Sequence, residues 1–166
     1  KAQSESQIDS LEQVLKQKQI TLAHKLNVYN DLAKLYNQNM PSAKGIEYAQ
    51  KAIKLSKRLH NPTAEGLAYN HWGDLHSKVN DRDWQGAIIY YHKALIIRKK
   101  IAKQYPDSLE RRLDVALTLS DIAYAYWQWG KLNEALENYK ESLKIAENLY
   151  KIDTKINKIE AFIALR

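Results

Sequence analysis

Three stretches of this chain carry the same spacing of side chains, and this repetition limits the fold more than any other feature. Each stretch places four residues at positions i, i+3, i+4 and i+7, which lie on one face of an α-helix. The three sets are Tyr29, Leu32, Ala33 and Tyr36; Tyr69, Trp72, Gly73 and His76; and Leu119, Ile122, Ala123 and Tyr126. The third member of each set is small and stands between bulky residues, which allows a second helix to approach closely.

A second helical pattern follows each of the first ones after a short gap. Its members are Gly45, Ala49 and Ala52; Ala87, Tyr91 and Ala94; and Ala135, Tyr139 and Ser142. The gaps contain turn-forming residues at 40–42, 80–83 and 129–131. We therefore expect three hairpins of antiparallel helices, in which the small residues of both helices face each other.

Capping residues help to place the ends of the expected helices. Asn61 before Pro62 is typical of a helix N-terminus, and Asp107 with Glu110 resembles a capping box. The expected helices cover residues 7–16, 21–38, 42–60, 62–79, 83–104, 107–129, 132–151 and 154–165.

The composition agrees with an all-α fold. Five glycines and three prolines in 166 residues are few for a β protein, which needs a turn every 8–12 residues or so. We predict one domain, 1–166, folded as an α–α superhelix of three hairpins with a leading and a trailing helix. Its parts are a leading segment (1–20), three repeats (21–60, 61–105 and 106–152), and the start of a fourth unit or a capping helix (153–166).

The paired patterns resemble the tetratricopeptide repeat. The resemblance is carried by Trp72-Gly73-x-x-His76 with Ala87-x-x-x-Tyr91-x-x-Ala94, and by Ile122-Ala123-x-x-Tyr126 with Ala135-x-x-x-Tyr139-x-x-Ser142. It covers roughly residues 21–151. The repeats are longer than the usual length of about 34 residues, as in the long-helix repeats of bacterial signalling proteins.

Three further segments resemble the sensory region of bacterial repeat-containing histidine kinases and related regulators. They are residues 6–12, 25–33 and 87–95. In that family the region follows an export signal and precedes a membrane helix and a signalling module. The resemblance implies an extracytoplasmic segment of a membrane-anchored sensor that continues beyond Arg166, with Lys1 to Ser4 just past a cleavage site. A cytoplasmic location is the alternative.

The sequence shows no pattern of catalytic, cofactor-binding or metal-binding residues. There is no cysteine, no glycine-rich phosphate loop and no nucleophile elbow. His71 and His76 are five residues apart, so they lie about 140° apart around a helix and cannot share a metal. His76 takes the place of Tyr36 and Tyr126, which predicts a packed imidazole. We expect no enzyme activity, no cofactor and no metal.

A row of polar and aromatic residues beside each packed stripe is the predicted binding site. In stacked hairpins the first helix of each repeat lines the concave side. The row contains Asn27, Asn30, Lys34, Asn37, Asn70, His71, Asp74, Lys78, Ser120, Tyr124 and Trp127. Carboxamides such as that of Asn70, which we expect outside the packed core, both donate and accept hydrogen bonds to a peptide backbone. Tyr124 and Trp127 would supply an apolar anchor.

These residues predict a non-catalytic module that binds a protein or an extended peptide. The net charge of +7 suggests an acidic partner. The clamp that some tetratricopeptide repeats use for the acidic C-terminus of a chaperone is not reproduced, because its places carry Asn30, Lys34, His71, Leu117 and Asp121. The eleven tyrosines and four tryptophans leave single-stranded nucleic acid as an alternative partner, although many of them lie on the stripes. A solvated helix face without function is the other interpretation of the row.

Overall fold

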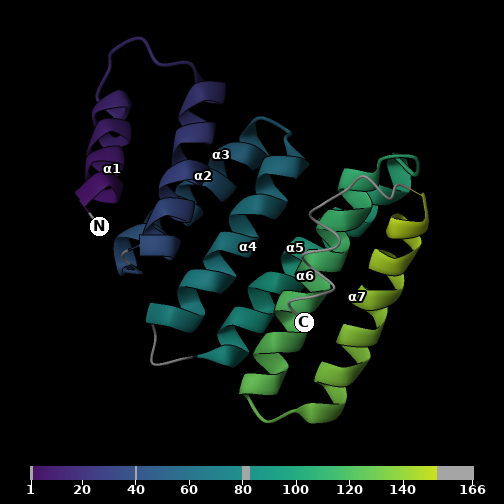
Figure 1. The fold of residues 1–166 in the computed structure, drawn as a ribbon. Helices are drawn as coiled ribbons and strands as arrows, with labels where there is room; N and C mark the ends of the chain where they lie inside the picture. The colour runs from purple at the N-terminus through teal and green to yellow at the C-terminus, as the bar shows by residue number, and fades with distance from the viewer. Residues whose placement is uncertain (1, 40, 80–82, 153–166) are drawn as a thin grey trace. The chain divides into compact units, whose positions relative to one another are not determined.

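The described part of the chain consists of helices joined by short turns. The computed structural model describes residues 2–39, 41–79 and 83–152, and within these ranges the chain forms seven α-helices and no strand (Figure 1). The helices are α1 (Ala2–Leu15), α2 (Leu22–Asn39), α3 (Ala43–Arg58), α4 (Pro62–Val79), α5 (Trp84–Gln104), α6 (Leu109–Gln128) and α7 (Leu132–Ile152). The all-α prediction is confirmed. The expected helix 154–165 lies outside the described residues.

The helix boundaries follow the expected ones closely, with two differences. Helix α1 begins at Ala2 instead of residue 7. Helix α6 is capped by Ser108, whose hydroxyl accepts a hydrogen bond from the Arg111 amide at 3.4 Å, so the expectation of a cap at Asp107 is wrong. The predicted cap at the start of α4 is confirmed, because Asn61 Oδ1 accepts from the Ala64 amide at 3.0 Å.

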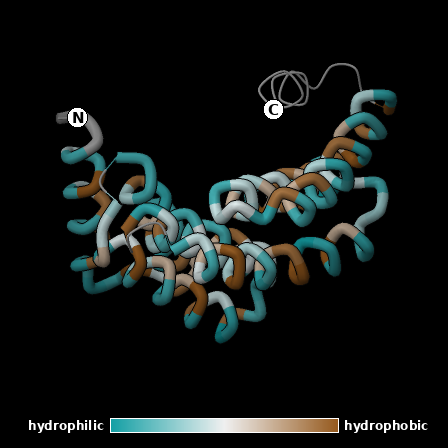
Figure 2. Tube along the Cα trace, turned by 90° about the horizontal axis from the view of Figure 1, so that it is seen from below, coloured by the Kyte–Doolittle hydropathy of each residue, from teal (hydrophilic) through white to brown (hydrophobic). Residues whose placement is uncertain are grey.

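The helices belong to two compact units, and each is described by itself. The first runs from Lys1 to Ala94 and the second from Leu95 to Arg166, so the division falls inside α5. Apolar and polar residues alternate along the turns of the helices, as the brown and teal segments in Figure 2 show. This alternation gives each helix one face for the core and one for water.

The core of the first unit is built on the predicted stripes. Leu32, Ala33 and Tyr36 of α2 are buried together with Tyr48 of α3 and Leu75 of α4. Two glycines allow the helices to come this close. A Cβ added at Gly73 would lie 2.6 Å from Cε1 of Tyr91 in α5, and one at Gly45 would lie 2.7 Å from Cβ of Tyr36. The predicted role of the small residues is confirmed at both positions.

The second unit packs α6 against α7 and the end of α5. Leu119, Ile122 and Ala123 of the third predicted stripe are almost completely buried, whereas its last member, Tyr126, is half-buried. The hydroxyl of Ser142 in α7 donates to the carbonyl of Ala116 in α6 at 2.6 Å, which satisfies a hydroxyl inside the contact.

Helix α1 is joined to the first hairpin by the carboxylate of Glu12. This group accepts hydrogen bonds from the hydroxyls of Tyr36 at 3.1 Å and Tyr48 at 3.0 Å, and pairs with Lys44 Nζ at 2.7 Å. Burial alone would raise the pKa of Glu12, but the bonds from Lys44, Tyr48 and Tyr36 outweigh it and hold the pKa below its ordinary value of 4.5. The ionised carboxylate therefore stabilises the docked α1.

We expect the stabilisation from Glu12 to disappear in acid. Because the pKa is lower in the folded than in the unfolded chain, the contribution is fully present above about pH 5 and is lost as pH falls through the folded pKa. Glu12→Gln should cost about 1 kcal/mol at pH 7, or roughly 2–4 °C in melting temperature.

Thermal unfolding of the two proteins between pH 7 and pH 3 measures this difference. The gap in melting temperature should close in the acid range. Glu47→Gln is the matched control, because Glu47 forms only an exposed pair with Lys51 on the surface of α3. A gap that stays constant down to pH 3 would contradict the role of the ionised carboxylate.

Candidate binding surfaces

The predicted polar row of the first unit is only partly exposed. The exposed members are Asn27, Lys34 and Lys78, Asp74 is half-buried, and the buried members are Asn30, Asn37, Asn70 and His71. Asn70 is only 8% exposed, so the expectation that it lies outside the packed core is wrong. The spacing of the row places these residues on the correct helices, but neighbouring helices cover several of them.

Several members of the row form hydrogen bonds with each other. Asn37 Nδ2 donates to Asp74 Oδ2 at 2.9 Å, and Lys78 Nζ donates to Asn37 Oδ1 at 2.6 Å and to its carbonyl at 3.1 Å. The hydroxyl of Tyr91 in α5 donates to the other oxygen of Asp74 at 2.7 Å. Asn37 and Asp74 therefore link α2, α4 and α5 within the fold, so these atoms are already used.

Asn30 is another buried member of the row. It is 5% exposed, and its Oδ1 accepts no hydrogen bond from the described part of the chain. Such a buried acceptor costs about 1–3 kcal/mol when it is left unsatisfied. Because this oxygen is inaccessible, it cannot contact a partner at the surface.

His76 lies at the edge of the first unit. Its ring packs 5.4 Å from that of Tyr90, and its Nδ1 lies 3.4 Å from Asp83 Oδ2. The imidazole is packed as predicted on one side, but on the other it faces an acidic side chain near the turn into α5.

The second unit exposes the aromatic part of the predicted site. Tyr124 is 42% exposed and Trp127 is 53% exposed, and their rings lie 5.8 Å apart on α6. Ser120, one turn earlier, is fully buried. Apolar rings of this size at the surface are typical of contact sites for proteins.

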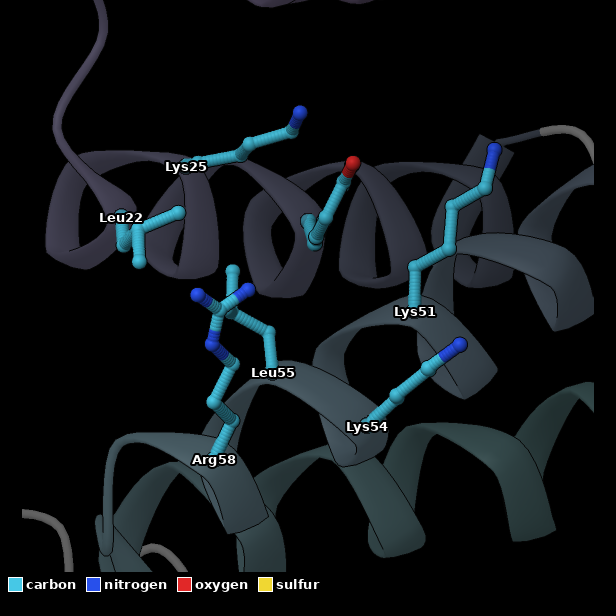
Figure 3. Close-up of a pocket in the computed structure, with 7 residues that line it drawn as sticks. Leu22, Lys25, Lys51, Lys54, Leu55 and Arg58 are labelled. Atoms are coloured by element: carbon cyan, nitrogen blue, oxygen red, sulfur yellow. The ribbon is translucent and has the colours of Figure 1, made fainter.

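A recess that was not predicted from the sequence lies between α2 and α3. Its volume is about 230 Å³, and its lining residues are Leu22, Lys25, Tyr29, Lys51, Lys54, Leu55 and Arg58 (Figure 3). Two signals could have indicated it. Lys25 and Tyr29 are four residues apart on α2, and Lys51, Lys54, Leu55 and Arg58 follow helical spacing on α3, so each set lies on one face.

The described residues offer neither a metal site nor a membrane-spanning helix. Within residues 2–39, 41–79 and 83–152, no group of three or more His, Asp or Glu side chains is arranged to hold a metal ion. None of the helices in these ranges is long and apolar enough to cross a membrane.

The chain is similar to known proteins in two ways. Residues 115–154 match the tetratricopeptide repeat family, and this range contains α6 from Val115 onward, the turn after it and α7. A protein of Arabidopsis thaliana named Protein NCA1 is 32% identical over 94 residues, which cover 57% of this chain and 22% of that protein. The chain thus spans only a small part of the relative that it matches. The family match concerns residues 115–154 alone, and the described part of this range forms one hairpin of helices in the second unit.

Proposed function

We propose that this chain is a non-catalytic module that binds a protein or an extended peptide, and that Tyr124 and Trp127 form its main contact. Tetratricopeptide repeats generally mediate protein–protein interaction. The observation that carries the proposal is the exposed pair of rings on α6, at two positions that the repeat pattern predicts to face a partner. Large aromatic side chains supply much of the binding energy at protein interfaces.

The exposed polar residues of the row would surround a peptide bound on the first unit. Asn27 and Lys34 lie on the accessible side of α2 and form no side-chain bond with the described part of the chain. The internal bonds of Asn37 and Asp74 remove those two residues from the proposed contact. We therefore assign a contact to each unit by itself: Asn27 and Lys34 on the first, and Tyr124 and Trp127 on the second.

The test is selection of a random peptide library on the intact chain, followed by affinity measurements on the selected peptides. Tyr124→Ala/Trp127→Ala should weaken binding at least about tenfold, since truncation of an interface aromatic costs more than about 1.4 kcal/mol. Tyr105→Ala is the matched control, because Tyr105 is also an exposed aromatic but lies outside the predicted row. Equal affinity of all three proteins would contradict the assignment.

Binding of single-stranded nucleic acid, the alternative function, would give a different result in the affinity measurements. A labelled oligothymidine that binds both the wild type and the double variant, with affinity that falls steeply as salt rises, would favour phosphate contacts over the aromatic pair.

We further propose that the module is the sensory or interaction region of a larger bacterial signalling protein and lies outside the cytoplasm. The support is the resemblance of residues 6–12, 25–33 and 87–95 to repeat-containing histidine kinases. The coding sequence before Lys1 tests the location. It should specify a basic stretch, then an apolar stretch, then small residues, and the absence of such a signal would favour the cytoplasm.

A further inference from the structure

We propose that the recess between α2 and α3 binds an acidic segment of a partner protein, with one apolar side chain inserted between the two helices. This inference rests on the proposed function, because it specifies the chemistry of part of the partner. It concerns a different surface from that of Tyr124 and Trp127.

The charge of the recess indicates an acidic occupant. Four of its seven lining residues are cationic, and none is Asp or Glu. Lys51 is partly neutralised by Glu47 at 2.5 Å, and Lys25 lies 5.8 Å from the centroid of the Tyr29 ring. Lys54 and Arg58 form no ion pair with any described carboxylate, so their charges are available to a ligand. Carboxylates are the natural partners of such groups.

A favourable interaction with the helix dipole explains only part of this cluster of cations. Arg58 stands in the last turn of α3, where a cation interacts favourably with the helix dipole. Lys25 comes from the first turn of α2, and Lys51 and Lys54 lie further from the end of α3, so the dipole does not explain them. Figure 3 shows Arg58 extending from α3 toward Leu22 of α2, so cations of both helices border one recess.

Part of the lining of the recess is apolar, and the volume of the recess suits a single side chain. Its apolar lining residues include Leu55, which is only 9% exposed, and Leu22, which is 40% exposed. The volume of about 230 Å³ is below the range of about 300–1,000 Å³ that is usual for small-molecule sites. It is sufficient for one leucine-sized side chain, which anchors a peptide by burial of apolar area.

The burial of Leu55 favours a peptide over a membrane surface as the occupant of the recess. Insertion into lipid requires apolar side chains that project beyond the basic ones. Here Leu55 is nearly covered, and Lys54 and Arg58 extend from α3 on either side of it (Figure 3).

The experiment measures the affinity of labelled synthetic peptides for the intact chain by fluorescence polarisation. The main probe is a heptapeptide with a central leucine between two runs of three glutamates. One comparison peptide has glycine in place of the leucine, and the other has glutamine in place of every glutamate. We expect both changes to weaken binding at least about tenfold, and added salt to weaken binding of the main probe.

Charge reversal locates the site. Lys54→Glu/Arg58→Glu should lower the affinity for the main probe at least about tenfold. Lys140→Glu/Lys144→Glu is the matched control, since it makes the same change in net charge at two exposed residues with the same spacing on α7. The control should retain nearly the affinity of the wild type. Equal weakening by both double variants would show non-specific attraction and overturn the proposal.

Two further arms separate this inference from other possibilities. The Tyr124→Ala/Trp127→Ala protein should bind the acidic probe as the wild type does, so failure of the aromatic contact and failure of the recess are distinguishable. Phosphatidylserine vesicles or an oligothymidine that bind through Lys54 and Arg58, when the leucine peptide does not, would overturn the peptide assignment.

Discussion

Gly73→Leu is expected to lower the free energy of unfolding by about 3 kcal/mol, the upper part of the range for overpacked cores. Even a Cβ at this position would lie 2.6 Å from Cε1 and 2.7 Å from Cδ1 of Tyr91. Tyr91 is itself buried and bonded to Asp74, so its ring cannot move away without breaking that bond. The melting temperature should fall by roughly 6–12 °C.

A double-mutant cycle identifies the clash as the cause. Gly73→Ala should destabilise the wild type although alanine is the better helix former by about 1 kcal/mol. In a Tyr91→Ala background the ring is gone, so Gly73→Ala should become neutral or stabilising. The measurement is chemical denaturation of the four proteins. An equal cost of Gly73→Ala in both backgrounds would show that Tyr91 is not the obstacle.

Asp74→Ala is expected to cost about 2–3 kcal/mol of stability, because Asn37 and Tyr91 each lose the charged acceptor of a hydrogen bond. The residue links α2, α4 and α5, so its loss should loosen the stacking of the first unit. Asp74→Asn, which keeps the volume and one acceptor, should cost less.

Thermal or chemical unfolding measures both variants against Lys34→Ala. Lys34 belongs to the same predicted row but is exposed, and its replacement should change stability by less than about 0.5 kcal/mol. If the Asp74→Ala protein were as stable as the wild type but bound the peptide more weakly, Asp74 would belong to the binding surface and not to the links within the fold.

The sequence by itself determined the helices and their packed faces. Small residues at Ala33, Gly73 and Ala123, at constant offsets from bulky ones, predict close helix contacts, and all three are buried. This inference succeeds because helical periodicity is a local property, so residues three and four positions apart share a face in any helix. The same periodicity predicted that Tyr124 and Trp127 lie on α6 beside the third stripe.

Only the tertiary structure decided which polar residues of the row face solvent. Asn37 and Trp127 each follow the last residue of their stripe, Tyr36 and Tyr126, yet the first is buried and the second is exposed. Their difference depends on which neighbouring helix covers them, and the sequence of one helix carries no information about that. Asp74 likewise accepts hydrogen bonds from Asn37 on α2 and Tyr91 on α5, which lie far from it in the sequence.

The recess between α2 and α3 is likewise a product of the tertiary structure. Lys25 and Arg58 are far apart in sequence and separately look like ordinary solvated residues. They border one cavity because the hairpin is antiparallel, which brings the start of α2 beside the end of α3. Periodicity determines the face of each helix, whereas the packing of two helices decides which side chains meet across it.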